Sequence, residues 1–94
     1  MENKLAAFKR TLEILDRLRN ECPWDRKQTN ESLRPLTIEE TYELADAILK
    51  ENDNEMQIEL GDILLHILFY AKIAEEKNKY TIETVCNILC DKLI

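Results

Sequence analysis

Five acidic residues recur at helical spacing in two separate segments of the chain. Glu39, Glu40 and Glu43 lie in the first segment, and Glu59 and Asp62 lie in the second. Residues three or four positions apart project from the same face of an α-helix. Each segment therefore places its carboxylates on one helical face, and two such faces packed together would form a cluster of oxygen atoms.

The second acidic pair has an apolar setting, in which an uncompensated charge is costly. Residues 60–74 are apolar on nearly every side of a helix, and only one narrow stripe, through Glu59, Asp62 and His66, is polar. Neighbouring buried carboxylates must become protonated, pair with basic residues or bind a cation. Carboxylate oxygens from two facing helices suit a hard ion such as Mg²⁺ or Mn²⁺. The expected metal ligands are Glu40, Glu43, Glu59 and Asp62.

Simpler interpretations of these residues remain open. The glutamates of the first segment could form a solvated face near a helix N-terminus, where negative charge is favourable. The second acidic pair could be neutralised by Lys or Arg. His66, the only histidine, could act as a general base near neutral pH, but a hydrogen-bonded structural role is preferred. It is not included among the catalytic residues.

The spacing of apolar residues predicts the helices that must position these acids. Residues 3–20 form an amphipathic helix, followed by a structured loop over 21–36 with at most one helical turn at 31–34. A second helix is expected to begin at Thr37, because Thr37 and Glu40 fit a capping box and Pro35 discourages an earlier start. This helix runs to about Lys50.

The rest of the chain is also expected to be helical. A third helix begins within the polar segment 51–54 and extends to about Lys77, and Thr81 begins a fourth whose apolar residues keep helical spacing. Short connections favour antiparallel neighbours, so a hairpin of 37–50 against 55–77 would join the two acidic faces. The prediction is one all-α domain over residues 1–94, an antiparallel bundle of about four helices. Pairing with a second copy would complete the core of so short a chain.

Composition excludes several classes of partner. The net charge of −6 argues against binding to nucleic acid or to an anionic membrane surface, and no apolar run is long enough to span a membrane. The odd number of cysteines, Cys22, Cys86 and Cys90, favours free thiols in a reducing cytoplasm. Cys86 and Cys90 are expected in the core, although their four-residue spacing could also serve a metal.

Four motifs together closely resemble the MazG family. They are Cys-Pro-Trp-Asp-Arg-Lys-Gln-Thr at 22–29, Ser-Leu-Arg at 32–34, Glu-Glu-Thr-Tyr-Glu at 39–43 and Glu-Leu-Gly-Asp-Ile-Leu-Leu at 59–65. The resemblance, which runs from about Leu12 to Leu93, implies an all-α homodimer or higher oligomer. It also implies Mg²⁺-dependent hydrolysis of nucleoside triphosphates to the monophosphate and pyrophosphate, a reaction suited to nucleotide-pool housecleaning. The catalytic residues implied are Glu39, Glu40, Glu43, Glu59 and Asp62, with Glu39 holding a second ion or orienting a water.

The resemblance leaves the substrate contacts less defined. Trp24 could stack on a nucleobase or anchor its loop to the helices, and the anchoring role is preferred; Arg26, Lys27 and Arg34 are candidate phosphate contacts. Family members usually continue past Leu93 into a basic, histidine-rich segment that this sequence does not contain. A noncatalytic, metal-stabilised interaction or regulatory module is the alternative function, and a preference for dUTP or a phosphoribosyl nucleotide is a further variant.

Overall fold

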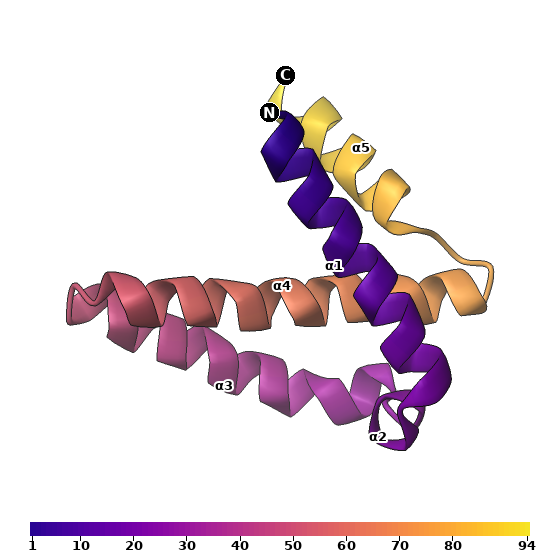
Figure 1. The fold of residues 1–94 in the computed structure, drawn as a ribbon, viewed down its shortest axis with the longest axis horizontal. Helices are drawn as coiled ribbons and strands as arrows, with labels where there is room; N and C mark the ends of the chain where they lie inside the picture. Colours follow the sequence, from indigo (N-terminus) through magenta and orange to yellow (C-terminus); the bar gives the residue numbers. More distant parts are fainter.

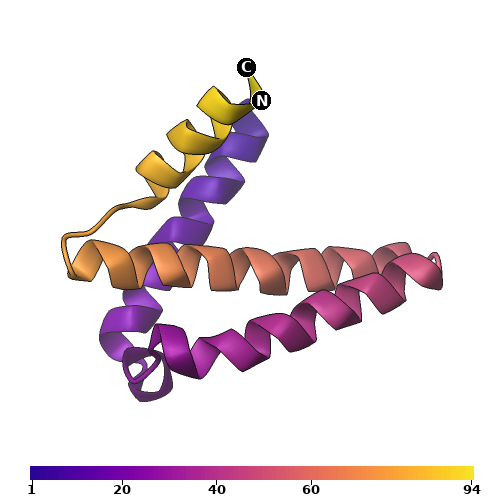
Figure 2. The same ribbon diagram turned by 180° about the vertical axis from the view of Figure 1, so that it is seen from behind.

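The computed structural model describes all of residues 1–94 and contains helices but no strands. Helices α3 and α4 form a long antiparallel hairpin, α1 crosses this hairpin, and α5 turns back toward the N-terminal end of α1 (Figures 1 and 2). The two chain termini lie close together in both views. The five helices are α1 (Glu2–Glu21), α2 (Pro23–Arg26), α3 (Asn30–Leu49), α4 (Asp53–Glu76) and α5 (Ile82–Leu93).

The predicted loop over 21–36 and the predicted helix start at Thr37 are wrong. The short helix α2 lies within that segment, and α3 begins at Asn30 with Thr29 as its N-cap. The Thr29 hydroxyl accepts a hydrogen bond from the Ser32 N–H at 3.0 Å, and the Ser32 hydroxyl accepts one from the Thr29 N–H at 2.8 Å. Pro35 therefore lies inside the helix. This capping box and the burial of Leu33 outweigh the backbone hydrogen bond that the proline removes.

The other predicted helix ends agree with the structure to within a few residues. Helix α1 ends before Cys22, whose backbone is extended because the next residue is Pro23. The hairpin turn follows Leu49, and Glu51 has a positive φ of 55°. The side chain of Asn52 then accepts a hydrogen bond from the Glu55 N–H and caps α4. Thr81 is the N-cap residue of α5, as predicted.

The hydrophobic core is small and lies where α1 crosses the hairpin. Only 8 of the 94 residues are buried, so the single chain forms an open arrangement of helices, and completion of the bundle by a second copy stays a prediction. The central cluster draws one residue each from α1 and α3 and three from α4. Its members are Leu15, Leu33, Leu68, Phe69 and Ile73.

Much of the apolar surface of the hairpin and of α5 faces outward. Tyr42 and Leu49 of α3 are 73% and 83% exposed, so these two apolar side chains lie mostly in solvent and do not pack against α4. The expectation that Cys86 and Cys90 belong to the core is also wrong, because both lie on the exposed helix α5. All three cysteines are free thiols, as predicted. None of the five helices combines the length and the apolar character that crossing a membrane requires.

Candidate metal centre

Three of the predicted metal ligands meet between the two long helices. Glu40 and Glu43 of α3 and Glu59 of α4 each place one carboxylate oxygen so that the three atoms lie within 4.8 Å of one another. Glu40 and Glu59 are half-buried, and Glu43 is exposed. The spacing Glu-x-x-Glu and the antiparallel hairpin together produce this group, because residues three apart on α3 face the same stretch of α4. We call it the carboxylate cluster.

The other two predicted acids lie beside the carboxylate cluster. Asp62 is half-buried on α4 three residues after Glu59, and its charge contributes to the raised pKa of Glu40. Its oxygens nevertheless lie outside the group of three. Glu39 is exposed next to Glu40. The structure thus brings three of the four predicted ligands together, with Asp62 adjacent and Glu39 at the margin.

The pKa of Glu40 reflects the uncompensated negative charge of the carboxylate cluster. The pKa of Glu40 is raised from 4.5 to about 7, first through a hydrogen bond with Glu59, then through loss of solvent and the charges of Glu43, Asp62 and Glu59. Two carboxylates offer only acceptors, so this hydrogen bond requires a proton on one of them. Without that proton, Glu40 Oε2 and Glu59 Oε2 are buried and have no hydrogen-bond partner. A proton or a cation would satisfy both atoms.

No basic side chain neutralises these acids, so the alternative of structural ion pairs is not supported. The negative charge of the carboxylate cluster therefore has no partner within the chain. The ion pairs that the structure contains lie elsewhere, as Arg17–Glu21, Arg19–Glu76, Lys50–Asp46 and Lys72–Asp16.

A polar network lies one helical turn from the carboxylate cluster. The Thr37 hydroxyl lies 3.1 Å from the Leu33 carbonyl oxygen, 2.8 Å from His66 Nδ1 and 2.6 Å from the Tyr70 hydroxyl. A hydroxyl has one proton and two acceptor sites. When Thr37 donates to the carbonyl, His66 and Tyr70 are therefore the donors to Thr37. His66 is half-buried and hydrogen-bonded, in agreement with the structural role preferred from the sequence, and Thr37 bridges the two helices instead of capping one.

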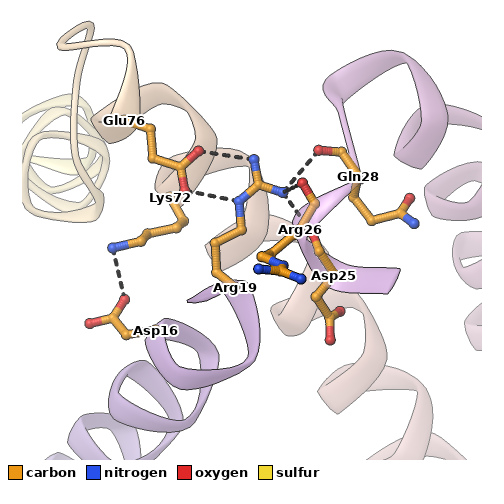
Figure 3. Close-up of polar contacts among 7 residues, drawn as sticks. All are labelled: Asp16, Arg19, Asp25, Arg26, Gln28, Lys72 and Glu76. Atoms are coloured by element: carbon orange, nitrogen blue, oxygen red, sulfur yellow. Dashed lines mark hydrogen bonds and ion pairs between the residues drawn. The ribbon is translucent and has the colours of Figure 1, made fainter. Parts of the chain in front are cut away.

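The loop that contains α2 is held by Arg19, a residue in none of the motifs (Figure 3). Arg19 Nη1 donates to the carbonyl oxygens of Asp25, Arg26 and Gln28 at 2.7, 3.2 and 3.0 Å. Its Nε and Nη2 atoms each donate to the Glu76 carboxylate at 2.9 Å, and the hydrogen bond with Arg19 holds the pKa of Glu76 below its usual value. Arg19 and Glu76 are 57 residues apart, so no local pattern could reveal this contact.

The side chains predicted to contact substrate are exposed. Trp24 is 58% exposed, so more than half of the residue is open to solvent, and the choice between anchoring the loop and stacking on a base stays a prediction. Arg26, Lys27 and Arg34 are also exposed. None of these three basic residues forms an ion pair. They are available to an anionic ligand, although no contact links them to the carboxylate cluster.

Fold and site together define a class of protein: a small all-α domain with a carboxylate cluster between two antiparallel helices, a donor set suited to divalent cations. Residues 28–94 match the MazG nucleotide pyrophosphohydrolase domain. This match covers more than half of the chain, and the chain belongs to the MazG family.

Two relatives and one solved structure show the extent of the similarity. The chain is 51% identical over 89 residues to the "Nucleoside triphosphate pyrophosphohydrolase/pyrophosphatase MazG" of Thermotoga maritima, covering 93% of this chain and 35% of that protein. It is 44% identical over 87 residues to the "Nucleoside triphosphate pyrophosphohydrolase" of Escherichia coli K12, covering 89% and 33%. The chain thus spans about a third of the length of these relatives. The crystal structure of a mazG-related protein from Thermotoga maritima matches with a TM-score of 0.79 and 29% identity, over 90% of this chain and 75% of that one.

Proposed function

We propose that this chain carries the catalytic site of a Mg²⁺-dependent nucleoside triphosphate pyrophosphohydrolase. The products would be the nucleoside monophosphate and pyrophosphate, and the reaction would suit the removal of unwanted nucleotides. One observation carries the proposal: two buried carboxylate oxygens, Glu40 Oε2 and Glu59 Oε2, have no partner in the chain, and no basic residue lies in an ion pair with them. Membership of the MazG family supports this choice of reaction.

The residues present fit a divalent cation. Glu40, Glu43 and Glu59 would hold the ion with Asp62 beside them, because Mg²⁺ and Mn²⁺ prefer carboxylate oxygens. Such an ion supplies charge neutralisation for a polyphosphate and lowers the pKa of water.

The remaining candidate residues have separate roles in this proposal. Glu39, exposed beside Glu40, would accept a hydrogen bond from the attacking water and orient it toward the α-phosphorus. Arg26, Lys27 and Arg34 would donate hydrogen bonds to phosphate oxygens, and Trp24 would stack on the base. Hydrolysis would form a bond between the water oxygen and the α-phosphorus, with release of a proton to solvent. It would break the bond between the α-phosphorus and the bridging oxygen, which leaves with the pyrophosphate.

We also propose that the active form is a homodimer or a higher oligomer of this chain. Most of the apolar residues that are more than half exposed lie on three helices, α3, α4 and α5, and two of these, α3 and α4, build the carboxylate cluster. An apolar surface of this kind is typical of an obligate interface between copies. The apolar members that are more than half exposed are Tyr42, Ile48, Leu49, Ile58, Leu60, Ile88, Leu89 and Leu93.

The activity test uses a panel of ribo- and deoxyribonucleoside triphosphates, including dUTP, with and without Mg²⁺. We expect pyrophosphate and the monophosphate in equal amounts, only when Mg²⁺ is present. In water enriched in ¹⁸O, attack at the α-phosphorus places the label in the monophosphate. No pyrophosphate from any nucleotide, together with a rise in melting temperature on adding Mg²⁺, would favour the noncatalytic module instead.

A further inference from the structure

A single side chain fixes the position of the α2 loop relative to α4. The Arg19 side chain is 12% exposed, and its guanidinium satisfies three carbonyl oxygens at the C-terminal end of α2 while it pairs with Glu76 near the end of α4 (Figure 3). The guanidinium also lies 5.5 Å from the centroid of the Phe69 ring in the core. Because guanidinium is planar and its five N–H groups point in set directions, it defines both the distance and the orientation of the loop.

A second set of hydrogen bonds joins the same loop to the start of α3. Gln28 Nε2 donates to the Trp24 carbonyl oxygen at 3.1 Å, and the Ser32 hydroxyl donates to Gln28 Oε1 at 2.8 Å. The hydrogen bonds of Arg19 and of Gln28 both reach the main chain of the loop. Its side chains at Trp24, Arg26 and Lys27 are left exposed. A rigid backbone that presents free aromatic and basic side chains is typical of a binding loop on a fixed scaffold.

We propose that Arg19 and Glu76 are positioning residues of the nucleotide site, which hold the α2 loop so that Trp24 can stack on the base of the substrate. This inference rests on the proposed function for the identity of the ligand. A neighbouring ion pair joins the same two helices without reaching the loop. Lys72 and Asp16 also pair across α4 and α1, at 3.1 Å, and make no contact with the loop (Figure 3).

The test uses the fluorescence of Trp24, the only tryptophan in the chain. Titration with a nonhydrolysable α,β-methylene nucleoside triphosphate and Mg²⁺ should quench the wild-type signal to saturation. Arg19→Lys keeps the positive charge and loses the fork of donors, so its half-saturating concentration should rise by about fivefold or more, in line with the loss of one base-stacking contact. In turnover, KM should rise by a similar factor while kcat changes by less than about twofold.

Asp16→Asn is the matched control, because it breaks an ion pair between the same two helices without touching the loop. Its half-saturating concentration should stay within about twofold of wild type, because the ion pair that it breaks makes no contact with the loop. Circular dichroism verifies folding, and Glu76→Gln replaces Arg19→Lys if the latter unfolds, with the same expected direction.

Two results would overturn the positioning role. One is wild-type titration behaviour in folded Arg19→Lys or Glu76→Gln. The other is release of pyrophosphate by the wild type while Trp24 fluorescence does not respond to the analogue. Conversely, if no triphosphate releases pyrophosphate and Trp24 still responds in an Arg19-dependent manner, the hydrolase proposal fails and the positioning role stands.

Discussion

Glu40 and Glu59 differ in their chemistry from the many glutamates on the surface of this protein. Each has one buried oxygen without a partner, and their proximity raises the pKa of Glu40 to about 7. Exposed glutamates elsewhere on α1 and α5 show no comparable environment. The distinguishing factor is a second carboxylate held nearby while solvent is withdrawn.

At this scale we predict that Glu59→Gln and Asp62→Asn each remove most of the turnover and leave the fold intact. Either change removes one negative charge from a repulsive group, so the metal-free protein should be at least as stable as wild type. Pyrophosphate release should fall by about 100-fold or more, as measured by kcat/KM. Glu83→Gln on the exposed part of α5 is the control for loss of one charge. Marked unfolding of both variants would point to a structural role instead.

The pair of Arg19 and Glu76 predicts a dependence of stability on pH in the acidic range. The pKa of Glu76 lies below 4.5 in the folded protein because of its hydrogen bond with Arg19. Between the folded and unfolded pKa values the unfolded state binds more protons, so the free energy of unfolding rises with pH. The contribution is complete above pH 4.5 and is lost as the pH falls through the folded pKa. Urea denaturation from pH 3 to pH 6 should show a shallower slope for Glu76→Gln than for wild type, and equal slopes would contradict the assignment.

At the scale of the elements, α3 shows how a local signal can be assigned to the wrong residue. Thr37 and Glu40 have the spacing of a capping box, and so do Thr29 and Ser32. The second pair starts the helix, because it allows Leu33 to be buried and places Thr37 where it bridges to His66 and Tyr70. A proline six residues after the N-cap was not sufficient to delay the start.

This start predicts that Thr29→Ala destabilises the protein by about 1 kcal/mol through loss of the N-cap. Chemical denaturation with the slope held constant would measure the change. Thr41→Ala, on an exposed position inside α3, is the matched control and should alter stability by less than half as much. If the two variants behave alike, the helix does not begin at Asn30 in solution.

At the scale of the whole molecule, the helices form an open arrangement around a small core. A hairpin with a small core at one end leaves apolar side chains of α3, α4 and α5 in water, which is unfavourable by roughly 25 cal/mol for each Å² of apolar surface. A second copy of the chain could cover this surface.

We predict that wild-type protein sediments as a dimer or a larger oligomer and that Ile88→Glu shifts it toward the monomer. Ile88 is 69% exposed in the single chain, so the substitution should cost the monomer little. Analytical ultracentrifugation over a range of protein concentrations measures the shift. Glu83→Gln, on the same helix, should leave the distribution unchanged. A monomeric wild type at all concentrations would contradict the proposed dimer.

The sequence by itself determined the helical class, the helix ends outside the segment 21–36 and the helical faces that carry Glu40, Glu43 and Glu59. These features depend on interactions within a few residues, such as the three-residue spacing of Glu40 and Glu43 or the polar turn before Asp53. Tertiary structure decided where α3 begins and that Trp24, Cys86 and Cys90 are exposed. It also decided that Arg19 forms hydrogen bonds with the main chain of the α2 loop. Each of those depends on which distant surface comes to lie against a residue, and no local spacing encodes that.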